Sequence, residues 1–263
     1  MPVDIGEAIQ EGVERTIARN GLYLVVITFV LDAVGALVSN DVAREVWIGA
    51  PQDVPIQRPP TGPSLGLSPT VAGLLSLVVS IVSLIVVIAA IRTFVSDETE
   101  TIPGEHFSHN VVLALVNLIV GGIVFGIVLA VGFVLFVIPG LFLLVSLLFW
   151  NVYVIVEDQN FIEGFRNSWG LTSGHRLRLF LLGVVVVVIG IVIGIVFGIP
   201  RAFLPRSIGF LVAQIGSAFS GVFVLATIAR TYEQLVAEEE AAESGPASQP
   251  DEGSEFEFGD DSP

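Results

Sequence analysis

Glu105, His106 and His109 are the residues whose types and spacing come nearest to a metal site. Imidazole nitrogens are common zinc ligands, but the His-Glu-x-x-His order of zinc proteases is not present and no third ligand is evident. Pro103 suits the first turn of a helix, and Glu105 suits its positive end. We therefore interpret this segment as a polar helix start and predict neither a bound metal nor a cofactor.

Asp32 is the only acidic side chain well inside a long apolar run. A charge at that depth in a bilayer costs several kcal/mol. Three interpretations remain open: a proton or cation site, a neutral carboxyl that bonds to Asn117, Gln214 or a backbone carbonyl, or a shifted helix that brings Asp32 to an interface. Asn117 and Gln214 are expected mainly to form hydrogen bonds between helices.

Other catalytic patterns are missing from the sequence. The chain contains no Cys, no Walker loop and no dinucleotide fingerprint. Ser173 and His175 are near neighbours on a turn, where the geometry of an activated nucleophile is rare. An enzyme is not expected, and a net charge of −15 argues against nucleic-acid binding.

The composition indicates a membrane protein from a salt-rich host. Hydrophobic residues make up 53% of the 263 residues, all eleven basic residues are Arg, and 26 residues are acidic. Molar salt shortens the Debye length to about 3 Å, which makes such an acidic surface tolerable. We predict an extreme halophile, an archaeon, as the source.

A membrane-spanning helix needs about 20 mostly apolar residues. Six segments meet this requirement: 22–39, 70–95, 110–137, 139–157, 177–199 and 207–230. The run 110–157 would be about 72 Å long as one helix, so the Pro139-Gly140 pair is expected to divide it into a tight hairpin of two spans. The sequence thus predicts an all-α integral membrane fold, a six-helix transmembrane bundle over residues 21–232.

Two shorter segments have the pattern of amphipathic helices at the membrane surface. Residues 1–20 place an apolar residue at every fourth position from Ile5 to Ile17. Residues 160–174 begin with a capping-box pattern at Asn160 and end at Gly174. Four residues in this second segment or just after it are candidate lipid contacts, the basic ones through phosphates: Trp169, His175, Arg176 and Arg178. The alternative is that the basic residues only fix the topology.

Small residues recur every four positions in the last two apolar segments. They are Gly190, Gly194 and Gly198 in one, and Gly209, Ala213, Ser217 and Gly221 in the other. Small faces let helices approach closely in lipid. We expect the two faces to meet, and Gly194→Leu to disrupt the bundle.

The Arg distribution favours both termini on the cytoplasmic side of the cell membrane, with seven Arg inside and four outside. Residues 233–263 carry eleven acidic and no basic residues, and are expected to form a disordered acidic tail. Phe256 and Phe258 in this tail could dock a cytoplasmic protein partner. A plain solvating tail is the alternative.

The region 136–180 resembles a broad group of uncharacterised prokaryotic membrane proteins, which includes the membrane domain fused to some glycerophosphodiester phosphodiesterases. The matching residues are Pro139, Gly140, Glu157, Ser168, Trp169, Leu171, Thr172 and Gly174. The role of this group is not established, so the resemblance implies a fold rather than an activity. The fused catalytic domain of the phosphodiesterases has no counterpart in this sequence, so their hydrolysis is not expected here.

The leading hypothesis is a non-enzymatic accessory, lipid-associated or regulatory membrane factor in contact with membrane lipids. The alternative is a transporter or channel for a small solute or lipid, centred on Asp32 and the small-residue faces. A transporter should have a polar cavity lined by Asp32 and its neighbours.

Overall fold

The structure is a computed structural model that describes residues 4–49, 62–96, 98–201 and 203–243. In this part of the chain all regular structure is helical, and the elements are α1 (Ile5–Ile17), α2 (Arg19–Gly49), α3 (Pro69–Val95), the short 3₁₀ helix η1 (Gly104–Phe107), α4 (Val111–Leu135), α5 (Val137–Ser146), α6 (Trp150–Val156), α7 (Phe161–Leu171), α8 (Arg176–Arg201) and α9 (Arg206–Glu243).

Six helical segments are long and apolar enough to cross a membrane. They are Arg19–Val46, Pro69–Val95, Val111–Leu135, Val137–Val156, Arg176–Arg201 and Arg206–Ala242. Each corresponds to one of the six segments expected from the sequence, so the all-helical class and the number of candidate spans are confirmed. The chain is a multi-pass membrane protein.

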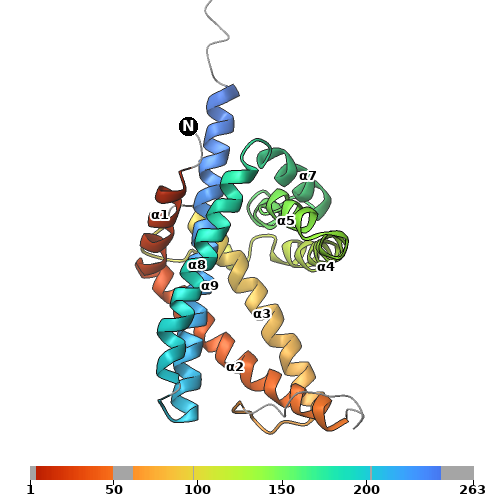
Figure 1. The fold of residues 1–263 in the computed structure, drawn as a ribbon, viewed down its shortest axis with the longest axis vertical. Coiled ribbons are helices and arrows are strands. Elements are labelled where there is room, and N and C mark those ends of the chain that lie inside the picture. Colours follow the sequence, from red (N-terminus) through yellow and green to blue (C-terminus); the bar gives the residue numbers. More distant parts are fainter. Residues whose placement is uncertain (1–3, 50–61, 97, 202, 244–263) are drawn as a thin grey trace, which may run out of the picture.

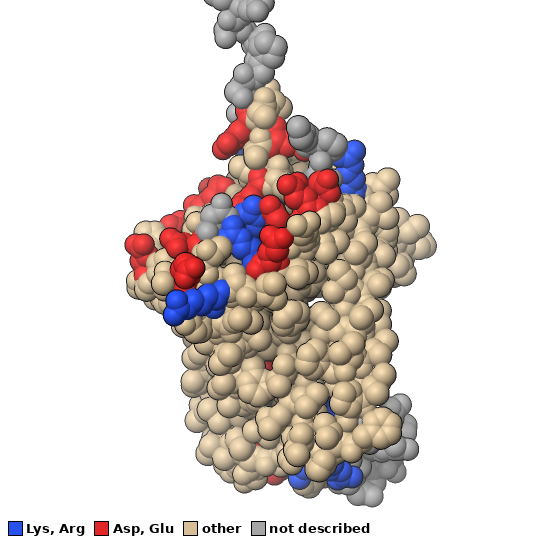
Figure 2. Space-filling view, turned by 90° about the vertical axis from the view of Figure 1, so that its left-hand side faces the viewer, with Lys and Arg blue, Asp and Glu red and all other residues tan. Residues whose placement is uncertain are grey.

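The helices are not all aligned. In Figure 1, α8 and α9 run side by side along the long axis, α2 and α3 slant away from them, and α4 is seen end-on. Charged side chains gather at the end that holds α1 and the last turns of α9, followed by a broad uncharged band (Figure 2). We call this the charged end; the opposite end holds the α8–α9 turn and residues 62–68, which lead into α3. The helices of the expected six-helix bundle are therefore not all aligned, because α4 lies crosswise to α8 and α9.

Helices α4 and α5 form a close antiparallel hairpin. The helix breaks at Phe136, whose φ of −162° is extended, three residues before Pro139, where the sequence predicted the turn. A Cβ on Gly140 would lie 2.5 Å from the Phe133 ring, and a Cβ on Gly132 would lie 3.1 Å from Gly140 Cα. The absence of side chains at Gly132 and Gly140 is what lets the two helices approach so closely.

A second break, at residues 147–149, separates α5 from α6. The Ser168 hydroxyl accepts from the backbone N–H of Phe149 (3.1 Å) and donates to the carbonyl of Ser146 (3.1 Å). The Thr172 hydroxyl donates to the same carbonyl (3.2 Å). All four residues are buried. Ser168 and Thr172 therefore satisfy backbone groups that an unbroken helix would have paired internally.

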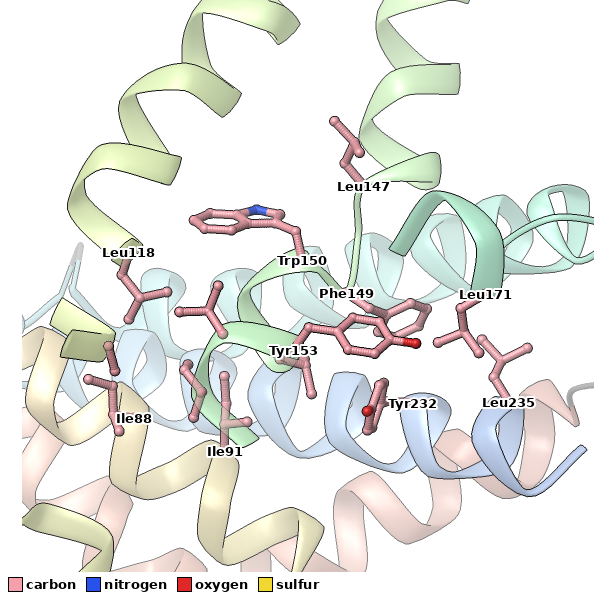
Figure 3. Close-up of a cluster of buried hydrophobic side chains, with 14 of the residues drawn as sticks. Ile88, Ile91, Leu118, Leu147, Phe149, Trp150, Tyr153, Leu171, Tyr232 and Leu235 are labelled. Atoms are coloured by element: carbon pink, nitrogen blue, oxygen red, sulfur yellow. The ribbon is translucent and has the colours of Figure 1, made fainter. Parts of the chain in front are cut away.

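The main core lies where α3, α4, α6 and α9 meet, near the charged end. Phe149 and Tyr153 pack against Tyr232 of α9, whereas Trp150 lies on the side of Leu118 (Figure 3). The Tyr153 and Tyr232 rings are perpendicular, with centroids 5.3 Å apart. This cluster joins the α4–α7 region to the long α9 helix.

Helix α1 packs on α9 through a different face from its isoleucine stripe. Ala8, Gly12 and Thr16 are buried, and a Cβ on Gly12 would meet Thr227. Ile17, at the end of the stripe, is 54% exposed. The small residues contact protein, Ile5 and Ile9 of the stripe are half-buried, and Val13 and Ile17 are exposed.

Two features differ from the sequence-based expectation. The small residues of α8 and α9 line a groove of about 560 Å³ between these helices, and among the described atoms none lies within 4 Å of a Cβ placed on Gly194. Close approach occurs at Gly216 instead, which faces Phe197. In addition, α9 continues to Glu243, so the tail does not begin at 233. Phe256 and Phe258 lie outside the described residues.

Candidate functional site

A cavity of about 640 Å³, open on one side and mostly apolar in its lining, lies between α2, α3 and α9. Its polar lining residues come from all three helices: Asp32 from α2, Ser80 and Ser83 from α3, and Gln214 and Ser217 from α9. Leu31, Gly35, Ala36, Val79, Leu84 and Val87 form the apolar walls. Polar groups that are far apart in the sequence thus converge within otherwise apolar helices.

The cavity lies at mid-depth in the helices that form it. Asp32 is 13 residues beyond Arg19, at the start of the first candidate span, and 14 residues before Val46, at its end. At a rise of 1.5 Å per residue these separations are each about 20 Å. Asp32 is therefore far from both ends of its helix, which disagrees with the interpretation that places it at an interface.

Hydrogen bonds join α9 to α2 at this carboxyl. Ser217 Oγ donates to Asp32 Oδ2 (3.1 Å), and Gln214 Nε2 donates to the backbone carbonyl of Asp32 (3.3 Å). The side chain of Asp32 remains half-buried and lines the cavity. One carboxylate oxygen is thus oriented by Ser217, and the carboxyl is still able to meet a ligand.

Asn117 lies elsewhere, at the contact of α4 with α7. Its side-chain oxygen accepts from the backbone N–H of Phe161 (3.2 Å), and its amide donates to the carbonyl of Leu113 (3.0 Å). The expectation that Asn117 and Gln214 bond between elements is therefore confirmed. The alternative in which Asn117 is the partner of Asp32 is not what the structure shows.

The four candidate lipid contacts have different surroundings. The Arg176 guanidinium lies 4.6 Å from the ring centroids of both Phe142 and Trp169, and donates to the carbonyl of Trp169 (3.3 Å). His175 Nδ1 lies 3.9 Å from a Glu238 carboxylate oxygen. Arg176 and His175 therefore have protein partners, whereas Arg178 is exposed at the start of α8.

The two histidines of the helix start have separate partners. His106 Nδ1 contacts the Thr93 hydroxyl (3.0 Å), and His109 Nε2 contacts Asp158 (3.0 Å). Burial, and then the charge of Arg92, lower the pKa of His106. Within the described residues, no three His, Cys, Asp or Glu side chains gather in a way that could hold a metal ion.

Arg92 joins several segments at the charged end, and the sequence analysis missed it. Its guanidinium donates to the carbonyls of Ile155 (2.9 Å) and His109 (2.6 Å) and lies 3.5 Å from Asp158. Its side chain is only 9% exposed. The sequence does show a basic residue in the last turn of a long apolar helix, which could have indicated this role. Arg92 entered only the prediction of membrane orientation from the Arg distribution.

Ser80, Ser83 and the bond from Ser217 to Asp32 were also missed as parts of one site. Serines at positions three apart place both hydroxyls on one face of α3, which was the available signal. Nothing in the sequence alone says that this face meets Asp32.

A family model described as a domain of unknown function (DUF7847) matches residues 3–235. The match includes every described helix except the last turns of α9. No curated protein and no solved structure matches the chain.

Proposed function

Because the chain belongs to the DUF7847 family, whose description assigns no role, we propose its function from the cavity. The protein is a non-enzymatic, lipid-associated membrane factor that binds an amphiphile at Asp32. The observation that carries this proposal is the convergence of five polar side chains from three helices on one cavity at mid-depth. Intramembrane polar residues are costly, and those that line a cavity are the usual marks of a ligand path or site.

The lining of the cavity defines the chemistry of the ligand. Asp32 accepts hydrogen bonds and attracts a positive charge, and Ser80 and Ser83 offer hydroxyls on the facing helix. Val79 and Leu84 provide apolar contact beside them. A molecule with a cationic or hydrogen-bond-donating head and an apolar body fits this combination.

The orientation and location belong to the same proposal. The charged end faces the cytoplasm and the protein resides in the cell membrane, as the Arg distribution favours. The acidic, Lys-free composition supports a host with a salt-rich cytoplasm. The exposed residues of the α1 stripe, Val13 and Ile17, and the exposed Arg178 are the proposed contacts with lipids on that side.

Native mass spectrometry of the protein released from its own membrane tests the proposal. Wild type should retain an amine- or guanidine-bearing amphiphile, and Asp32→Asn should lose it. Glu105→Gln, which removes one negative charge on η1 far from the cavity lining, is the matched control and should retain it. Retention of the same species by Asp32→Asn at wild-type level would contradict the proposal.

Transport is a second candidate, which the same cavity favours because its polar groups lie midway between the two ends of the helices. Purified protein in sealed vesicles should then accelerate uptake of a small cation, with methylammonium as the probe, and Asp32→Asn should abolish the acceleration. Uptake equal to that of protein-free vesicles would remove this candidate without affecting the binding proposal.

A further inference from the structure

We propose that the α4–α5 hairpin is a re-entrant element that enters the leaflet on the charged side and does not cross the membrane. Its exposed apolar surface is covered by the acyl chains of that leaflet. This inference does not depend on the Asp32 cavity. It changes the topology from six complete spans to four spans and one wedge, and leaves both termini on the same side.

The first argument is the chemistry of the hairpin tip. From Leu118 to Val145 the sequence has no charged side chain and none that forms hydrogen bonds. The tip is open in the structure, with Val134, Phe136 and Ile138 exposed at 86%, 73% and 79%. A turn that emerged on the far side would place these side chains among head groups and water. That arrangement is unfavourable because large apolar side chains would be exposed to water.

The turn between α8 and α9 provides an internal comparison. It is also short, but it is bordered by Arg201 and Arg206, both exposed. This turn also exposes an apolar side chain, Phe203 at 85%, but charged residues border it on both sides. The α4–α5 turn has no such charged border.

The second argument is direction. In Figure 1 the hairpin lies beside α8 on the opposite side from α1, at about the height of α1, and α4 points along the line of sight. It does not extend toward the opposite end, where the α8–α9 turn lies. Helix α4 is long enough to cross a membrane, so its orientation, and not its length, keeps it on one side.

The backbone at the tip suits a site without water. The N–H of Phe136 donates to the carbonyl of Gly132 (3.1 Å), and the carbonyl of Phe136 accepts from Gly140 (3.3 Å). Pro139 has no N–H, so the first turn of α5 has one donor fewer to satisfy. Backbone groups left unpaired in hydrocarbon have no water to bond to, so these pairings stabilise the tip within the membrane.

Both ends of the hairpin are fixed at the charged end. At the start of α4, Asn110 and His109 bond to Asp158 (2.9 and 3.0 Å), which follows α6. After α5, the chain bends at the 147–149 break that Ser168 and Thr172 hold. This bend sets the direction of α5 relative to α6, so a straight fourth span does not form.

Single-cysteine labelling tests the proposal, since the chain has no native Cys. Phe136→Cys places a thiol at the tip, Ser68→Cys marks the opposite end before α3, and Ser173→Cys marks the charged end after α7. Each variant is reconstituted in vesicles of dioleoylphosphatidylcholine and dioleoylphosphatidylglycerol. A membrane-impermeant maleimide is added to one side at a time, and a nitroxide at the same thiol reports accessibility to oxygen and to a water-soluble nickel chelate.

The expected result is that Ser68→Cys and Ser173→Cys are labelled from opposite sides, while Phe136→Cys is labelled from neither. The nitroxide at 136 should be accessible to oxygen and shielded from the nickel chelate. Labelling of Phe136→Cys from the same side as Ser68→Cys would show two complete spans and overturn the proposal. Shielding of the nitroxide from both reagents, with dipolar coupling between copies, would show that a second copy and not lipid covers the tip, which would also overturn it.

Discussion

The break between α5 and α6 allows a prediction whose size follows from its hydrogen bonds. The variants Ser168→Ala and Thr172→Val remove the two hydroxyls that contact the carbonyl of Ser146. Ser168 also accepts from the N–H of Phe149, a residue with no exposed surface. The two variants therefore differ in what they leave unpaired.

Thr172→Val leaves Ser146 bonded to Ser168, so it should lower the free energy of unfolding by only about 0.5–1 kcal/mol. Ser168→Ala leaves the N–H of Phe149 buried without a partner, which costs about 1–3 kcal/mol. In the double variant the carbonyl of Ser146 also loses both donors. The combined loss should exceed the sum of the single losses by about 1 kcal/mol.

Unfolding in mixed micelles by added dodecyl sulfate, followed by tryptophan fluorescence, measures these free energies. Trp150 lies in the core beside the break and reports its loss. The control is Ser173→Ala, which changes an exposed side chain and should match wild type. Single losses below about 0.5 kcal/mol that add without coupling would refute the role given to these hydroxyls.

Three further predictions concern packing and charge. Gly216→Leu should destabilise the α8–α9 pair, because a Cβ at this position lies 2.7 Å from Phe197, whereas Gly194→Leu should be tolerated. Thermal melts in detergent measure both variants, and a lower melting temperature for Gly194→Leu than for Gly216→Leu would contradict this. Burial lowers the pKa of His106, so the unfolded chain binds this proton more tightly than the folded protein does. The free energy of unfolding should therefore fall as the pH drops below about 6.5. Unfolding measured across pH checks this, and His106→Gln should remove the effect. Arg176→Lys should cost about 1 kcal/mol in the same micelle unfolding assay because an ammonium stacks less well between two aromatic rings, and an unchanged midpoint would argue against the sandwich.

The sequence predicted well those features that depend on local pattern. Long apolar runs gave the six candidate spans, and the capping box at Asn160 and Glu163 is present with Gly174 at a φ of +85°. These outcomes depend on hydropathy and on the chemistry of a helix end, both of which are read within a few residues.

Features that depend on the arrangement of distant helices were predicted less well. From the recurrence of small residues we predicted that α8 pairs with α9, which the structure confirms, and that Gly194 lies at the close contact. The close contact is at Gly216 instead, and no described atom lies within 4 Å of a Cβ placed on Gly194. Helical spacing shows which residues share a face of a helix. It does not show how far the helix is rotated about its axis, which depends on partner side chains such as Phe197. The crosswise hairpin follows from the bond of Ser168 to a segment about twenty residues away, which no local pattern reveals.

The candidate site was predicted in two of its five polar members, Asp32 and Gln214. Asp32 was identified because a carboxyl in an apolar run is unusual, and Gln214 was expected to bond between helices. Ser80 and Ser217 are ordinary residues in membrane helices, and only the fold brings them to one cavity.

A titration in nanodiscs tests most directly whether the cavity binds an amphiphile through Asp32. The ligand is dodecylamine, and dodecyl sulfate is the comparison ligand of opposite charge. Dodecylamine should bind wild type and Glu105→Gln alike, and its dissociation constant for Asp32→Asn should be at least about tenfold higher, which corresponds to about 1.4 kcal/mol. Dodecyl sulfate should not show this difference. Equal affinity of dodecylamine for wild type and Asp32→Asn would contradict the proposed role of the cavity.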